Sequence, residues 1–138
     1  MPETILAFDY GLRRIGVAVG QDVTASASPV GSIANGDNGV DYDHMSRLIA
    51  EWHPSRLVVG LPLHADGSSS EMTDSVHAFV AELAQYRLPV ETVDERYTSI
   101  EAERTLKQAR QQGSRGRISK ADIDAAAAVC IAERYLAG

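Results

Sequence analysis

The sequence has few of the features that mark secreted, membrane-spanning or disulfide-bonded proteins. Its one cysteine, Cys130, cannot form a disulfide within the chain, and this indicates a reducing compartment. The longest uninterrupted apolar run, residues 125–132, is far too short to span a bilayer, and no basic-then-apolar leader opens the chain. We therefore expect a cytoplasmic protein with no membrane partner, and we expect Cys130 to be a buried core thiol.

Two common site motifs are also missing. The four histidines are scattered, and no Cys/His spacing suggests a zinc site. The chain has no Gly-x-x-x-x-Gly-Lys-Ser/Thr loop of the kind that holds nucleotide phosphates. With 138 residues, of which 44% are hydrophobic and 23% charged, the composition is that of one globular domain over residues 1–138.

Basic charge is concentrated in one short segment. Taken alone, the net charge of −6 argues against a nucleic-acid partner. Between residues 104 and 121, however, the chain carries no acid and six basic residues: Arg104, Lys107, Arg110, Arg115, Arg117 and Lys120. This segment predicts contacts with phosphates, which dominate the affinity of proteins for nucleic acids. The alternative interpretation is a solvated helix face followed by a loop.

Apolar patterning predicts a mixed sheet that begins with a meander. Residues 4–10 and 15–20 are two apolar runs around the turn "GLRR", and a third extended stretch covers 24–33. Pro29 places that third stretch at a sheet edge, because proline cannot donate a ladder hydrogen bond. Residues 56–63 and 88–96 are predicted as further strands.

Helical spacing of apolar residues predicts the helices. The first helix starts at a cap, Asp41 or Asp43, and ends at Pro54. A second helix carries Met72, Val76, Phe79, Val80 and Leu83 on one face, and a third runs from Thr98 to about Gly113. The last helix extends from Ser119 to residue 136, with four residues expected on its inner face: Ile123, Ala127, Cys130 and Ile131.

Four acids stand at the ends of predicted elements in apolar surroundings: Asp9, Asp94, Glu95 and Asp124. Any one of them alone would be read as a cap, turn or surface residue. As a set they could converge beyond the carboxyl ends of the strands, where open α/β sheets bind ligands. Such close like charges repel unless a divalent cation neutralises them, and ligation by oxygen alone favours Mg²⁺ or Mn²⁺.

Each acid has an expected role at such a site. Asp9 would be the central metal ligand on the first strand, and Glu95 and Asp124 would complete the site. Asp94 and Glu95 are adjacent on a strand and therefore point to opposite faces, and of the two we select Glu95. Two metal ions held in this way can activate a water and stabilise the leaving oxygen of a phosphodiester. The predicted catalytic and metal-binding residues are Asp9, Glu95 and Asp124.

Four segments of the sequence resemble the RuvX/YqgF family: "FDYGLRRIGVAVG", "VVGLPLHADGS", "DERYTSIEAE" and "KADIDAAAAVCIAERYL". These RNase H-like proteins are related to Holliday junction resolvases and are described as pre-16S rRNA nucleases. The resemblance implies an α/β, RNase H-like fold with a mixed five-stranded sheet and helices on both faces. It also matches Asp9 and Asp124 to the first and last acidic positions of the family. Asp94–Glu95–Arg96 matches the middle position, and the Asp94/Glu95 choice stays open.

The resemblance further implies a metal-dependent nuclease that acts on structured nucleic acid. The expected substrate is the 5′ end of pre-16S rRNA, branched DNA or both. A non-catalytic nucleic-acid-binding or ribosome-assembly module with the same fold is the alternative. We expect a monomer or a weak homodimer. The expected nucleic-acid-binding residues are Arg13, Arg14, Arg96, Lys107, Arg110, Arg115, Arg117 and Lys120.

Overall fold

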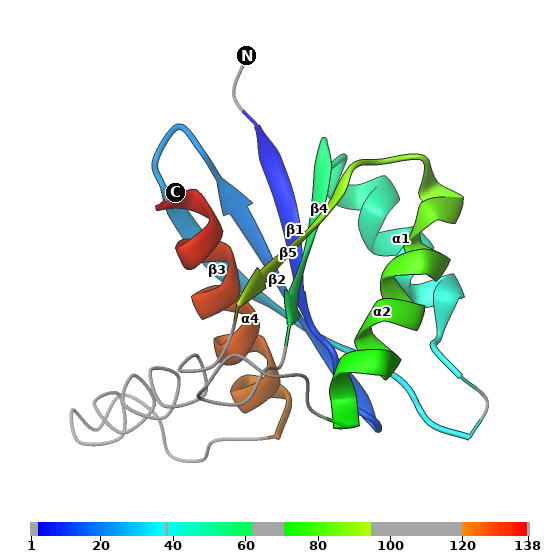
Figure 1. Ribbon diagram of the computed structural model, residues 1–138. Helices are drawn as coiled ribbons and strands as arrows, with labels where there is room; N and C mark the ends of the chain where they lie inside the picture. The colour runs from blue at the N-terminus through cyan, green and yellow to red at the C-terminus, as the bar shows by residue number, and fades with distance from the viewer. Residues whose placement is uncertain (1–2, 38, 62–70, 95–119, 138) are drawn as a thin grey trace, which may run out of the picture.

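A computed structural model describes residues 3–37, 39–61, 71–94 and 120–137 of the chain. A five-stranded mixed sheet lies at its centre, in the order β3-β2-β1-β4-β5 (Figure 1). The first three strands form an antiparallel meander: β1 (Thr4–Asp9), β2 (Arg14–Gln21) and β3 (Ser26–Ala34). The other two strands run parallel to β1: β4 (Arg56–Leu61) and β5 (Val90–Asp94). The predicted mixed five-stranded sheet is therefore confirmed.

Helices cover both faces of the sheet, as expected (Figure 1). On one face lie α1 (Tyr42–Trp52) and α2 (Glu71–Leu83), and α2 runs into the 3₁₀ turn η1 (Ala84–Tyr86). On the other face lies α4 (Lys120–Leu136). Parallel strands need a crossover connection, and α1 and α2 belong to the crossovers from β3 to β4 and from β4 to β5. In the part of the chain that the structure describes, no helix is long and apolar enough to cross a membrane.

The side chains of β1 alternate between the two faces and so fix the orientation of its last residue. Leu6 and Phe8 are buried in the core under α1 and α2, whereas Ile5 and Ala7 are buried against α4. A strand has a side-chain period of two, and Asp9 therefore continues the set that faces α4. Asp9 is half-buried and stands where β1 ends.

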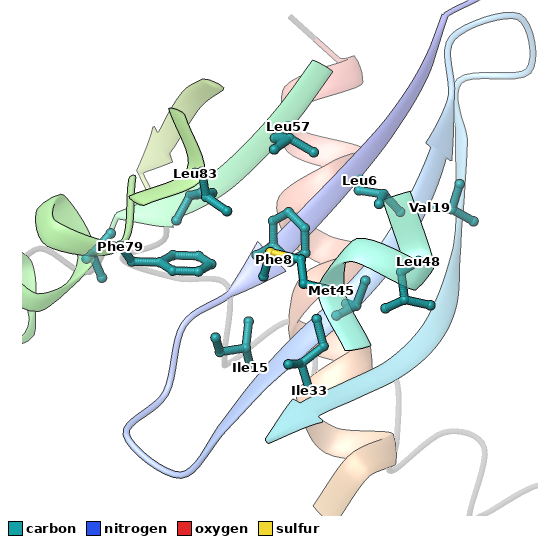
Figure 2. Close-up of a cluster of buried hydrophobic side chains, with 13 residues drawn as sticks. Leu6, Phe8, Ile15, Val19, Ile33, Met45, Leu48, Leu57, Phe79 and Leu83 are labelled. Atoms are coloured by element: carbon teal, nitrogen blue, oxygen red, sulfur yellow. The ribbon is translucent and has the colours of Figure 1, made fainter. Parts of the chain in front are cut away.

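The two cores differ in size and in residue type. Figure 2 shows the larger one, where Phe8 on β1 points toward Phe79 on α2. Their rings meet edge to face, with centroids 6.0 Å apart, a favourable geometry for an aromatic pair. On the other face α4 presents mainly small buried side chains: Ala125, Ala127, Ala128, Ile131 and Ala132. These small residues let the α4 backbone approach the sheet closely.

The ends of α1 and the edge position of β3 were predicted correctly from local sequence. Asp41 is the cap of α1, where its Oδ1 accepts from the backbone N–H of His44 at 3.1 Å. The helix ends at Trp52, and His53 adopts a left-handed conformation just before Pro54. β3, which carries Pro29, is an edge strand as predicted. The predicted helix from Thr98 to about Gly113 and the basic loop after it lie outside the described residues.

The expected inner face of α4 was wrong at two positions. Ile123 is 46% exposed, and Cys130 is half-buried rather than a core thiol. At 100° per residue, Ile123 falls on the side of the helix opposite to Ala125, Ala128 and Ala132, which define the buried stripe. The prediction followed the larger apolar side chains, but the close approach of α4 to the sheet selects alanines. Ala127 and Ile131 are buried, as expected.

Candidate metal and nucleic-acid site

The carboxyl ends of the parallel strands gather at one edge of the sheet. β1 ends at Asp9 and β5 ends at Asp94, with β4 between them. α4 begins at this same end of the molecule (Figure 1). Open α/β sheets bind ligands beyond the carboxyl ends of their strands. At this end of the sheet, the acids at the strand ends are brought toward the first turns of α4.

Gly16 places Asp124 beside Asp9. In the antiparallel β1–β2 ladder, Gly16 is the direct partner of Asp9. A Cβ atom built on Gly16 would lie only 2.0 Å from the backbone carbonyl oxygen of Asp124. The backbone of α4 therefore rests on β2 at the residue opposite Asp9, and only a glycine leaves room for it. The structure thus brings together two of the three predicted metal ligands, Asp9 and Asp124.

An arginine from β2 holds the side chain of Asp124. Arg14 alternates onto the same face as Gly16, and its Nε donates to Asp124 Oδ2 at 2.7 Å. The Arg14 side chain is 36% exposed and that of Asp124 is 21% exposed, so that the ion pair lies at the rim of the site. This charge-assisted hydrogen bond compensates the negative charge of Asp124 at the end of the sheet that also carries Asp9. Arg14, which we expected to hold phosphates, is paired with a predicted metal ligand in the structure.

The turn between β1 and β2 is held by Asn35, a residue that follows β3. Asn35 Nδ2 donates to the carbonyl oxygen of Gly11 at 2.7 Å, and its backbone N–H donates to the carbonyl oxygen of Arg13 at 2.9 Å. The side chains of Leu12 and Arg13 are exposed on this turn. Arg13 is therefore accessible from solvent at the end of the sheet that carries Asp9.

Asp94 belongs to the other face of the sheet. On β5, Val90 packs against the core under α1 and α2, whereas Val93 packs against the core under α4. The alternation therefore assigns Asp94 to the face opposite Asp9. The backbone carbonyl of Asp94 accepts from Arg134 Nη1 at 2.7 Å, and this bond ties the end of β5 to α4.

No third described residue completes a metal site with Asp9 and Asp124. Within residues 3–37, 39–61, 71–94 and 120–137, no three His, Cys, Asp or Glu side chains are grouped so that they could hold a metal ion. Glu95 and Arg96 lie outside the described residues, as do Lys107, Arg110, Arg115 and Arg117. Lys120 is the first residue of α4, and its side chain is not described.

Three residues with a positioning role were missed from the sequence: Gly16, Asn35 and Arg134. A glycine inside an apolar strand is a recognised signal of close backbone approach, and Gly16 carries this signal. Asn35 lies in a segment that composition identifies only as a loop. Arg134 offers no local signal, because its partner is a backbone carbonyl that is distant in the sequence.

Comparisons with known proteins identify the family. The family model described as "RuvX: Holliday junction resolvase" matches residues 3–138. A protein of Paraburkholderia xenovorans (strain LB400), named "Putative pre-16S rRNA nuclease", is 43% identical over 136 residues, which are 98% of this chain and 88% of that protein. A protein of the same name from Burkholderia lata is 46% identical over 134 residues, which are 96% of this chain and 88% of that protein.

Solved structures show the same fold at low sequence identity. RuvC of T. thermophilus in complex with a Holliday junction substrate superposes with a TM-score of 0.57 and 12% identity, over 96% of this chain and 94% of that one. The yeast mitochondrial Holliday junction resolvase gives a TM-score of 0.53 and 9% identity, over 96% and 77%. RuvC-type resolvases have the RNase H-like fold, and the predicted fold class is therefore confirmed. With the family model and these relatives spanning nearly its whole length, this chain belongs to the RuvX family.

Proposed function

We propose that this protein is a nuclease that hydrolyses phosphodiester bonds in structured nucleic acid, with Mg²⁺ or Mn²⁺ held by Asp9, Glu95 and Asp124. The observation that supports it best is the seating of Asp124 on Gly16, directly across the ladder from Asp9. Two elements far apart in the sequence thereby present carboxylates at one sheet edge. This donor set fits hard divalent cations, which prefer oxygen ligands.

Glu95 is the third residue of the proposed site by elimination. Asp94 faces the side of the sheet opposite Asp9. Of the two adjacent acids, we therefore keep Glu95, although it lies outside the described residues. Its assignment depends on the strand alternation of its neighbours.

The residues around the acids have distinct tasks in the proposed reaction. Divalent ions held by Asp9, Glu95 and Asp124 would supply an activated water and would stabilise the leaving oxygen. Asp9 and Asp124 hold the ions through their carboxylates. The contact of the Asp124 backbone with Gly16 sets the distance between the two acids. Arg13 is exposed on the turn that Asn35 holds, and it contacts the phosphate backbone next to the scissile bond. The basic segment Arg104–Lys120, with Arg96, extends this contact.

For the substrate we propose the 5′ end of pre-16S rRNA, which places the protein in the cytoplasm. Two relatives that are 43% and 46% identical to this chain over the aligned residues carry the name of such a nuclease. The RuvC structure with a Holliday junction shares only 12% and supports the fold alone. Branched DNA stays the second candidate substrate, because the family is described as a Holliday junction resolvase.

Cleavage assays with both substrates test the proposal. The purified protein is incubated with an RNA that spans the 5′ processing site of pre-16S rRNA and with a four-way DNA junction, each with Mn²⁺ and with EDTA. We expect Mn²⁺-dependent cleavage of the RNA and none by Asp9→Asn. Tight binding of the RNA without cleavage by the wild-type protein would instead support a non-catalytic module. Cleavage of the junction alone would make DNA the substrate.

A further inference from the structure

Arg14 is directed at Asp124 by the backbone of the sheet. It lies two residues before Gly16 on the same strand, and the backbone of Asp124 rests on Gly16. The register of β2 therefore sets where the guanidinium meets the carboxylate. The bond joins Nε to Oδ2 at 2.7 Å across residues that are 110 positions apart in the chain. Such a pair depends on the packing of α4 on β2 and is a built feature of the site.

The same carboxylate is a ligand in the proposed function, so that the guanidinium on Oδ2 and a cation on either oxygen share one negative charge. An arginine bound to Asp124 Oδ2 takes part of the negative charge that would attract a divalent cation, and the two positive groups repel each other at this range. The pair is also partly exposed on both sides, at 36% and 21%. Ion pairs of this kind are weak, and a divalent cation can therefore displace the arginine at small cost.

We propose that Arg14 and the divalent cation compete for Asp124, and that cation binding releases the Arg14 guanidinium to contact a phosphate of the nucleic acid. This inference rests on the proposed function, because it assumes that Asp124 binds a cation. It makes Arg14 a positioning residue that links the two bound states: paired with Asp124 before the metal binds, and paired with substrate afterwards. The metal-free protein thus keeps Asp124 paired with Arg14, and metal binding releases a phosphate-binding group beside the metal.

Arg13 provides a matched control for this idea. It is the neighbouring residue and carries the same charge, but its side chain is exposed on the turn, and in the described part of the chain no ion pair is found for it. Replacing Arg13 changes the net charge of this edge by the same amount as replacing Arg14. A difference between the two variants therefore reports the Arg14–Asp124 pair and not the overall charge.

The first experiment measures Mn²⁺ affinity by titration calorimetry for the wild-type protein, Arg14→Met, Arg13→Met and Asp124→Asn. We expect Arg14→Met to bind Mn²⁺ more tightly by about twofold to fivefold, the range that corresponds to one partly exposed ion pair. Arg13→Met should change the affinity much less, and Asp124→Asn should weaken it strongly. Equal tightening in both arginine variants, or weaker binding by Arg14→Met, would overturn the competition.

The second experiment measures binding of the precursor RNA with Ca²⁺ and with EDTA, over a series of KCl concentrations. Each phosphate contact contributes about 0.7 to 0.9 to the slope of log affinity against log salt. We expect Ca²⁺ to add about one such contact for the wild-type protein and for Arg13→Met, and none for Arg14→Met. A full gain by Arg14→Met would refute the release of this side chain.

These outcomes separate the inference from the proposed function. If the wild-type protein binds no Mn²⁺, or if Asp124→Asn binds Mn²⁺ as tightly as the wild-type protein does, the proposed metal site is refuted. If the wild-type protein binds Mn²⁺ through Asp124, and Arg14→Met and Arg13→Met have the same Mn²⁺ affinity, the metal site stands and only the competition is refuted.

Discussion

Two arginines of the sheet each bind one end of α4, and the contacts that they make differ. Among the described residues, Arg14 meets the first turns of the helix through one partner, Asp124. At the far end, Arg56 Nη1 donates to the hydroxyl of Tyr135 at 2.7 Å. Arg56 also pairs with Glu3 at 3.1 Å and with Glu91 at 3.0 Å.

The difference between these ends separates a structural role from a functional one. The partners of Arg56 come from the start of the chain, from β5 and from α4, and together they hold four segments with one side chain. Both acids at that end, Glu3 and Glu91, pair with the same guanidinium. At the Asp9 end, Arg14 pairs with Asp124 and joins only two segments, β2 and α4. We infer that the Arg56 end stabilises the fold and that the Asp9 end is kept for a ligand.

The largest effect should come from the acid at the end of β1. Asp9→Asn keeps the shape of the side chain and removes the charge that ligates the metal. We expect cleavage of the precursor RNA to fall more than about 100-fold, beyond the losses typical for groups that only support metal ligands. The midpoint of thermal unfolding should stay or rise, because a like charge is removed from beside Asp124. Unchanged cleavage by the folded variant would exclude Asp9 from the reaction.

The next effect concerns the contact that sets Asp124 in place. In Gly16→Ala, the new methyl group would overlap the backbone oxygen of Asp124, which cannot move without shifting α4. We expect a loss of about 1–3 kcal/mol in the free energy of unfolding, as for other overpacked cores, together with a loss of cleavage. Gly36→Ala is the control, since a Cβ there meets nothing within 4 Å. Equal stability of the two variants in urea would contradict the close packing.

A direct comparison of the two arginines should give a smaller effect. Arg14→Met breaks one partly exposed ion pair and should change the free energy of unfolding by no more than about 1 kcal/mol. Arg56→Met removes contacts with two carboxylates and a tyrosine hydroxyl, and it should lower the midpoint of thermal unfolding by more than Arg14→Met does. The reverse order would mean that the structural role belongs to the Asp9 end.

The smallest effect is a dependence of stability on alkaline pH at the Arg56 end. Burial raises the pKa of Tyr135, and a hydrogen bond with Glu91 raises it further. A tyrosine whose pKa is higher in the folded protein stabilises the fold below its ordinary pKa of about 10 and loses this contribution as the pH rises above it. We therefore expect urea stability to fall above about pH 10, and to fall less steeply in Tyr135→Phe. An identical pH profile for the variant would exclude this contribution.

The sequence predicted the sheet and much of the helical order because each depends on local patterns. The apolar runs around "GLRR", the proline of β3 and the capping Asp41 each carry their signal within a few residues. The positions of Asp9 and Asp124 at element ends were likewise readable. Two residues expected on the inner face of α4, Ile123 and Cys130, were wrong, because the approach of the helix backbone to Gly16 decides which side is buried.

The contacts that build the site could not be predicted in the same way. The Arg14–Asp124 pair and the bond from Arg134 to the Asp94 carbonyl join segments that are 110 and 40 positions apart. Arg14 was predicted as a phosphate-binding residue like Arg13, because both arginines stand in the turn after Asp9. Only the alternation along β2 and the position of α4 distinguish them.

Paramagnetic broadening by Mn²⁺ tests the central claim, that the divalent site lies at the Asp9 end, most directly. Both ends of the sheet carry acids, so that the Arg56 end serves as an internal reference within the same molecule. In a titration followed by amide NMR, we expect substoichiometric Mn²⁺ to broaden the signals of Asp9, Gly16 and Asp124 first, and to leave those of Glu3, Arg56 and Glu91 sharp. Broadening that starts at Glu3 and Glu91, or that is uniform over the sheet, would contradict the site.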